Sequence, residues 1–66
     1  MFVIFYKTNN VFLAEEILNI NKVFCEIVPT PVQDKAYCGI CLNVLKVDKS
    51  RVMNLLKGIE FKIIEE

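Results

Sequence analysis

The sequence contains no histidine and no tryptophan, and it has only two glycines and two prolines in 66 residues. Histidine is the most frequent general base and a common metal ligand, so its absence excludes most familiar catalytic constellations. The carboxylates do not replace it, because no pair of them is spaced for general acid–base work. We therefore expect a non-enzymatic protein rather than an enzyme.

An excess of either charge is also missing, because eight Lys and Arg balance eight Asp and Glu. No basic run is present that could follow a phosphate backbone, which argues against binding to nucleic acid. The longest uninterrupted apolar stretch covers residues 1–6, whereas a membrane helix needs about 20 apolar residues. We expect no nucleic-acid partner, no membrane partner and a cytoplasmic location.

Cysteine is present, but in a number and spacing that exclude a disulfide-stapled secreted domain. There are three cysteines, an odd count without regular disulfide spacing. We expect reduced thiols. Zinc needs four ligands, so the two cysteines that lie close in sequence could hold it only if a dimer pooled two pairs. We expect no metal and no cofactor.

What the sequence does contain is apolar residues, at 55% hydrophobic against 24% charged. A chain of this length forms one domain, residues 1–66, which buries only about 60% of the surface of its unfolded form. So apolar a composition in so small a domain indicates self-association.

The hydrophobic pattern predicts six elements. The first strand is apolar on both faces, which is typical of a central strand, and the last alternates with charges, which suits an edge. Thr8, Asn9 or Asn10 is expected to cap the first helix and Asp48 the second, which Gly58 ends. The expected strands are residues 2–6, 23–28, 40–46 and 60–64. The expected helices are residues 11–20, with Leu13 and Ile20 among their apolar residues, and 49–57.

The element order β-α-β-β-α-β predicts an α+β fold of the ferredoxin-like type. In this fold a four-stranded antiparallel sheet carries both helices on one face. The third strand then lies antiparallel beside the first. The other face of the sheet is free for the expected homodimer.

One loop, residues 29–41, concentrates the unusual residues, and we call it the cysteine loop. Pro29 and Pro31 stiffen its start, and Gly39 permits a backbone conformation that a residue with a Cβ would resist. Both features predict that the loop holds Cys38 in a fixed position. Antiparallel pairing of the first and third strands brings Cys38 toward the start of the first helix.

The start of that helix, at Thr8, Asn9 and Asn10, favours an anion because its N–H groups and dipole are positive. A thiolate or persulfide on Cys38 is such an anion, and Lys35 in the same loop adds positive charge. Simpler interpretations stay open. The three polar residues can form an ordinary helix cap, the prolines can merely stiffen a connection between two strands, and Lys35 can be a solvated charge.

The cysteines admit alternatives too. Cys25 is expected to be a structural residue of the second strand. Cys38 and Cys41 form a C-x-x-C pattern, which is typical of thiol-disulfide redox proteins. In an extended chain their Cα atoms lie about 10 Å apart, beyond the limit of about 7 Å for a disulfide. Either both cysteines act as a redox pair, or Cys38 acts alone with Cys41 in the core, or neither acts and the protein is a small dimeric binding module.

The chain resembles the selenium/sulfur carrier protein-like family over nearly its whole length. The family pattern has a strand, a turn with Ser or Thr, a helix with a central Glu, and a P-x-P-R loop leading into C-G. The matching residues are Thr8, Glu15, Pro29, Pro31, Cys38 and Gly39. This resemblance implies a persulfide or selenide carried on Cys38, received from a donor such as a cysteine desulfurase and passed to an acceptor protein.

The chain departs from the family pattern at two positions of the loop. Val32 stands where the family usually has arginine, an anion-binding residue, and Lys35 stands where serine is common. Lys35 is therefore the candidate replacement for the missing positive charge.

Overall fold

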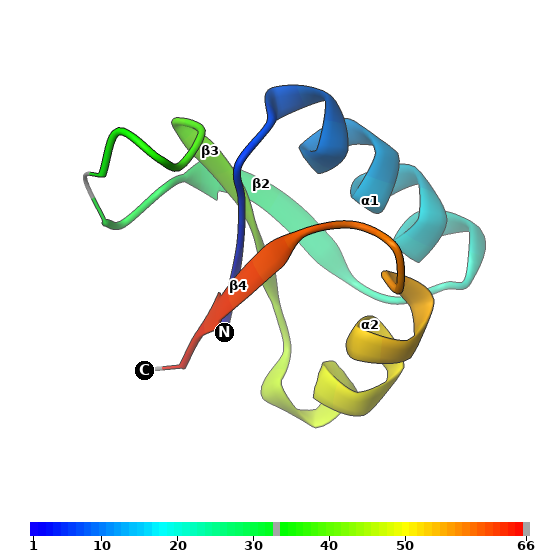
Figure 1. Cartoon of the computed structure of the whole chain (residues 1–66). Coiled ribbons are helices and arrows are strands. Elements are labelled where there is room, and N and C mark those ends of the chain that lie inside the picture. Colours follow the sequence, from blue (N-terminus) through cyan, green and yellow to red (C-terminus); the bar gives the residue numbers. More distant parts are fainter. Residues whose placement is uncertain (33, 66) are drawn as a thin grey trace.

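The computed structural model describes residues 1–32 and 34–65; Gln33 of the cysteine loop and Glu66 at the end of the predicted domain lie outside the described residues. The chain forms four strands, two α-helices and one short 3₁₀ helix (Figure 1). In order these are β1 (Phe2–Phe5), α1 (Thr8–Ile20), β2 (Cys25–Pro29), β3 (Ile40–Val44), η1 (Lys46–Asp48), α2 (Lys49–Leu55) and β4 (Phe61–Ile64).

All four strands belong to one sheet in the order β2-β3-β1-β4, and every neighbouring pair is antiparallel. The predicted α+β class is therefore confirmed. The central position of β1, the edge position of β4 and the pairing of β3 with β1 are confirmed as well. Val3 pairs with Leu42, and Ile4 pairs with Cys41.

The core lies between the sheet and the two helices, which cover the same face of the sheet (Figure 1). Alternate residues of β1 and β3 point into it because successive side chains of a strand face opposite sides. Its members are Met1, Val3, Phe5, Val11, Ala14, Leu18, Val23, Leu42, Val44, Val52 and Leu56. We call the other side of the sheet, with Phe2, Ile4, Cys41 and Asn43, its open face.

Helix α1 begins earlier than predicted, and the expected capping by Thr8, Asn9 or Asn10 is wrong. These residues form the first turn of the helix, and the N-cap is Lys7. The backbone makes the turn itself, since the Asn10 N–H donates to the Lys7 carbonyl at 3.0 Å. Within the described residues, the Lys7 side chain makes no capping hydrogen bond.

Two residues expected on the apolar face of α1 lie elsewhere. Val11, Ala14 and Leu18 are fully buried, whereas Leu13 and Ile20 are exposed. At 3.6 residues per turn, Leu13 and Ile20 are on the far side of the helix from that buried set. The 3–4 spacing of apolar residues therefore ran around most of α1 and did not identify the face that is buried.

Other strand and helix boundaries differ from the predicted ones by a few residues. β2 begins at Cys25 instead of residue 23, and it includes Pro29, which pairs with Ile40 at the sheet edge. β3 ends at Val44 because η1 starts at Lys46, and α2 ends at Leu55. Asp48 is the N-cap of α2 as predicted, although its side chain makes no capping bond to the described residues. Gly58 follows α2 with φ +92°, a conformation that favours glycine.

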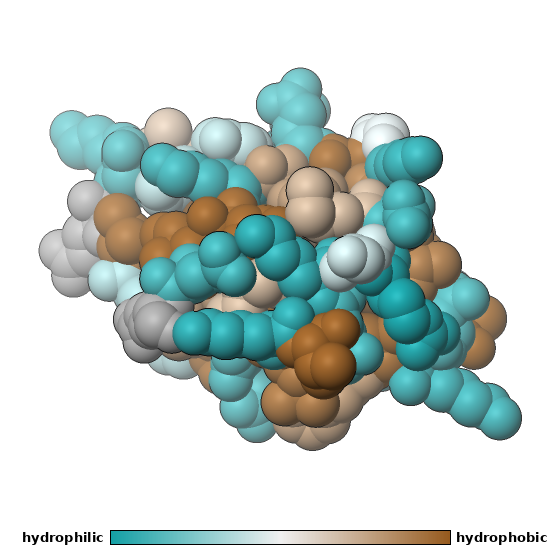
Figure 2. Space-filling view, turned by 90° about the horizontal axis from the view of Figure 1, so that it is seen from below, coloured by the Kyte–Doolittle hydropathy of each residue, from teal (hydrophilic) through white to brown (hydrophobic). Residues whose placement is uncertain are grey.

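Hydrophobic side chains reach the surface as well as the core. The view from below shows brown hydrophobic areas between teal hydrophilic side chains (Figure 2). Exposed large hydrophobic residues occur on α1, η1 and α2, among them Phe12, Val47 and Met53. Among the described residues, neither helix has the length and apolar character required to cross a bilayer.

Candidate functional site

The cysteine loop is closed at its base by Thr30, a residue that the sequence reasoning missed. The Thr30 N–H donates to the Gly39 carbonyl at 3.0 Å, and its hydroxyl donates to the Cys38 carbonyl at 2.8 Å. Pro29 pairs with Ile40 just beyond. A hydroxyl residue between two prolines was the signal in the sequence. Thr30 thus joins the two ends of the loop next to Cys38.

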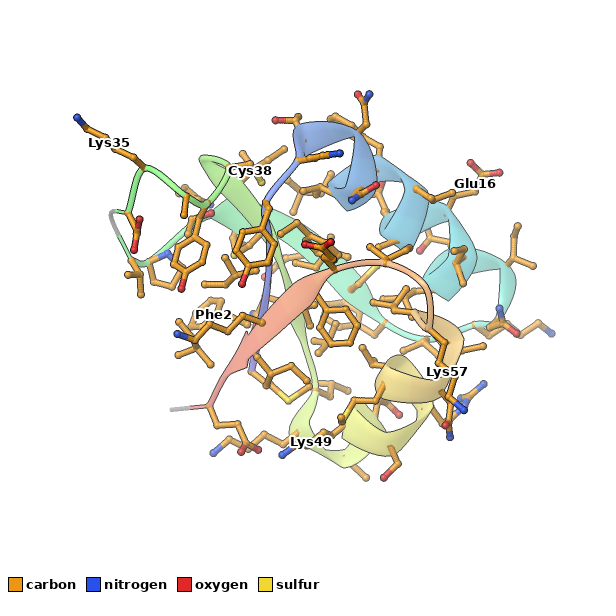
Figure 3. The ribbon with its side chains drawn as sticks, viewed as in Figure 1. Phe2, Glu16, Lys35, Cys38, Lys49 and Lys57 are labelled. Carbon is orange, nitrogen blue, oxygen red and sulfur yellow. The ribbon has the colours of Figure 1, made fainter. Side chains whose placement is uncertain are left out.

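Cys38 is held from its other side by β1. Its N–H donates to the Phe5 carbonyl at 2.9 Å, and its half-buried side chain packs against the core. Phe5 precedes Thr8 by three residues, so Cys38 lies beside the connection from β1 to α1 (Figure 3). A direct interaction of the sulfur with Thr8, Asn9 or Asn10 stays a prediction.

The Cys38 thiol donates to the carbonyl of Ile40, with 2.8 Å between Sγ and the oxygen. This contact lies along the start of β3 and needs the thiol proton. A Cys38 that carried a second sulfur would have no proton on Sγ and would lose the bond. Sulfur loading is therefore expected to change the contacts of this side chain.

The role expected for the Gly39 backbone is wrong. Gly58 is the glycine with a φ in the left-handed region, and Gly39 is not in that region. Apart from Gly39 and its two chain neighbours, no atom of the described residues lies within 4 Å of a Cβ added at Gly39. The residue leaves open space beside Cys38 and is not required for a special turn.

Cys41 and Cys25 have environments that keep their thiols protonated. Cys41 is fully buried in β3. Burial raises its pKa, with a smaller contribution from nearby Cys38, although a hydrogen bond with Thr30 opposes the rise. Cys25 is half-buried at the start of β2 as expected, and burial together with the charge of Glu15 raises its pKa.

The C-x-x-C cysteines lie on different sides of the chain. Cys38 and Ile40 pack against the core on the helix side, whereas Cys41 alternates to the open face, where it pairs with Ile4 and Val28. All three cysteines are free thiols. A disulfide between Cys38 and Cys41 would require the start of β3 to rearrange.

A family model described as "Putative Se/S carrier protein-like" matches residues 1–65. The chain belongs to this family. No curated protein and no solved structure matched it. The family match covers all four strands and both helices of the Se/S carrier-like chain.

Lys35 of this Se/S carrier-like chain lies at the tip of the loop. Its side chain is exposed and points away from Cys38 (Figure 3). A turn precedes Cys38, in which the Ala36 N–H donates to the Asp34 carboxylate at 2.9 Å and the Tyr37 N–H donates to the Asp34 carbonyl at 3.1 Å. The structure therefore brings Thr30 and Phe5 to Cys38, and a role for Lys35 stays a prediction.

Tyr37, next to Cys38, was also missed. Its ring centroid lies 5.5 Å from that of Tyr6, and Lys62 of β4 donates to its hydroxyl at 3.2 Å. This hydrogen bond raises the pKa of Lys62. An aromatic residue adjacent to the candidate cysteine was the available signal. In this Se/S carrier-like chain, Tyr37 thus connects the loop to Tyr6, the residue that follows β1, and to Lys62 of β4.

The site is a surface site. Over residues 1–32 and 34–65, the chain has no pocket and no cluster of three His, Cys, Asp or Glu side chains that could hold a metal ion. Among these residues, Cys38 is half-buried and Gly39, the residue after it, is exposed.

Proposed function

We propose that the chain is a carrier in which Cys38 holds sulfur or selenium as a persulfide or selenide. The observation that carries the proposal is the position of Cys38 within a chain that matches the Se/S carrier-like family over residues 1–65. Its backbone is anchored to Phe5 and Thr30, while the residue after it, Gly39, is exposed with open space around its Cα. Cys41 is fully buried, and burial together with the charge of Glu15 raises the pKa of Cys25, which makes both less suited to the role.

The transfer step balances without an oxidant. The Cys38 thiolate attacks the outer sulfur of a donor persulfide, a new S–S bond forms at Cys38, the S–S bond of the donor breaks, and the donor thiolate leaves. Delivery is the same exchange, in which an acceptor thiolate attacks the outer sulfur on Cys38. With selenium, the bond that forms at Cys38 and the bond that breaks in the donor are both sulfur–selenium bonds. The outer atom extends the side chain by about 2 Å.

The finer parts of the proposal concern the surroundings of the cargo. We assign the domain to the ferredoxin-like group, supported by the element order and by the strand order β2-β3-β1-β4. In this arrangement the anionic cargo on Cys38 lies near the first turn of α1, at Thr8, Asn9 and Asn10, whose N–H groups favour negative charge. Free thiols suit a reducing compartment such as the cytoplasm.

The test is sulfur loading followed by mass spectrometry. The reduced chain is incubated with a cysteine desulfurase and L-cysteine, and intact and peptide masses are measured without reductant. The expected result is the mass of one added sulfur on the peptide with Cys38, lost in Cys38→Ser and kept in Cys25→Ser. Removal of the added sulfur by dithiothreitol identifies it as a persulfide.

Cys41→Ser separates the carrier from the redox alternative. A carrier keeps its added sulfur in this variant, whereas a Cys38–Cys41 redox pair shows a loss of two hydrogens that either substitution abolishes. Absence of both mass changes under conditions in which the desulfurase is active would leave the binding-module reading and refute the carrier.

A further inference from the structure

The outer face of α1 carries three large apolar side chains among polar ones, where a surface helix is normally polar. Val11, Ala14 and Leu18 point into the core, and the opposite side of the helix carries Phe12, Leu13 and Ile20. Their exposed fractions are 51%, 47% and 72%. We call these three residues the α1 patch. Large apolar side chains this exposed on one helix face, next to the polar Asn9, Glu16 and Asn19, have the composition of a docking surface.

The charges around the α1 patch favour a different protein over a second copy of the chain. Glu16 is exposed between Phe12 and Ile20, and the charged residues of Thr8–Ile20 are Glu15 and Glu16. A two-fold axis that buried the whole patch would pass near Glu16 and bring it against the same residue of the copy. Like charges in an interface disfavour such pairing. A partner with a basic side chain at this point fits instead.

The α1 patch also lies within reach of a protein that touches Cys38. Along the helix axis, Phe12 is about 6 Å and Ile20 about 18 Å from Thr8. A typical interface covers about 800 Å² on each partner, a disc of about 16 Å radius. Cys38 and Glu16 lie along the same upper side of the molecule, and Lys49 and Lys57 lie along the lower side (Figure 3).

We propose that the α1 patch is the docking surface for the protein that donates sulfur or selenium to Cys38. The donor presents apolar side chains to Phe12, Leu13 and Ile20 and an Arg or Lys to Glu16. This inference rests on the proposed carrier function and adds how the donor is recognised. Small-molecule donors need no docking, so they load Cys38 independently of the patch.

The experiment compares two sulfur donors on the full chain. A cysteine desulfurase with L-cysteine is the protein donor, and glutathione persulfide is the small donor. The patch variants are the double substitution Phe12→Gln/Ile20→Gln and the single substitution Glu16→Lys. Both change exposed positions, and circular dichroism checks that they fold. Loading of Cys38 from the desulfurase is expected to slow at least tenfold, with unchanged loading from glutathione persulfide.

Matched controls lie away from the α1 patch. Val47 is 86% exposed at η1, so Val47→Gln removes an exposed apolar side chain of similar kind. Lys57→Glu reverses a charge two residues after α2, on the lower side of Figure 3. Both controls are expected to load from the desulfurase at the wild-type rate.

The remaining outcomes distinguish the two proposals. Patch variants that load from the desulfurase like wild type overturn the docking surface. Variants that load normally but deliver sulfur slowly assign the patch to the acceptor and overturn its assignment to the donor. If Phe12→Gln/Ile20→Gln abolishes a dimer of the chain, the α1 patch is a dimer interface, and this result also overturns the assignment to the donor. Wild type that loads only from glutathione persulfide keeps the carrier and overturns the docking, and wild type that loads from neither donor overturns both.

Discussion

At the scale of single residues, the two glycines differ in what a side chain would meet. Gly58 has φ +92°, whereas Gly39 lies outside the left-handed region with free space around its Cα. Gly58→Ala is expected to lower the free energy of unfolding by about 1–2 kcal/mol. Gly39→Ala is expected to leave it unchanged or raise it by up to about 1 kcal/mol, because alanine restricts the unfolded chain. Urea unfolding followed by circular dichroism measures both.

Each glycine variant serves as the control for the other, because both replace a glycine by an alanine. Equal losses of stability in the two would contradict the assignment of the strained backbone to Gly58. A loss confined to Gly39→Ala would restore the role that the sequence pattern predicted for this residue.

The two shielded thiols predict how stability depends on pH. The pKa values of Cys25 and Cys41 are raised in the folded chain, mainly by burial. Their contribution to stability is therefore complete below the ordinary thiol pKa of about 8.5 and is lost as the pH rises toward the folded-state values. Urea unfolding under reductant is expected to show a falling free energy of unfolding from about pH 8 upward.

Cysteine substitutions isolate that thiol contribution from the titration of tyrosines and lysines. Cys25→Ser and Cys41→Ala should each flatten the decline relative to wild type. Profiles that stay parallel to the wild type would mean that the two thiols ionise equally in the folded and unfolded chains.

At the scale of elements, α2 depends on a few buried side chains. It covers Lys49–Leu55 only, and Val52 and the following Leu56 are fully buried in the core it shares with α1. Leu56→Ala is expected to cost about 2–5 kcal/mol, a large part of the stability of a domain this small. Met53→Ala, on the exposed side, should cost less than about 1 kcal/mol. Urea unfolding measures both variants. Similar losses in the free energy of unfolding would contradict the burial of Leu56 and the exposure of Met53.

The elements themselves could be predicted because their signals are local. The apolar run of residues 2–6 placed β1 in the centre, and the alternating charges of β4 placed it at an edge. Boundaries at α1 failed because Thr8, Asn9 and Asn10 all resemble caps while the backbone turn forms at Lys7. Its buried face could not be predicted, because apolar residues occur around the helix and only packing shows which of them is covered.

The site shows the same division between local and long-range signals. Cys38 and its approach to the first connection followed from strand order, which is a consequence of element order. The contacts that hold it depend on residues far apart in sequence, namely Phe5, Thr30 and, through Tyr37, Lys62. The sequence marks Thr30 only by its place between two prolines and Tyr37 only by its place beside Cys38, so the partners of both residues emerged from the structure alone.

At the scale of the whole molecule, one core joins both helices to one face of the sheet, so the α1 patch lies on the far side of α1 and the open face lies on the far side of the sheet. Association through the open face, which the composition predicts, is compatible with donor docking because the helix side stays free. Ile4 and Cys41 on the open face are fully buried, while Phe2 and Asn43 are partly covered. A second copy would complete that cover.

A dimer through the open face predicts that the unfolding midpoint rises with protein concentration, because association stabilises only the folded chain. We expect Phe2→Ala to weaken this dependence, since Phe2 lies on the open face, and Ile20→Ala to keep it. Urea unfolding over a hundredfold range of concentration, with sedimentation velocity on the same samples, measures both. A midpoint independent of concentration in wild type would make the chain a monomer. Loss of the dependence in Ile20→Ala would place the dimer on α1, where it competes with the donor for the same surface.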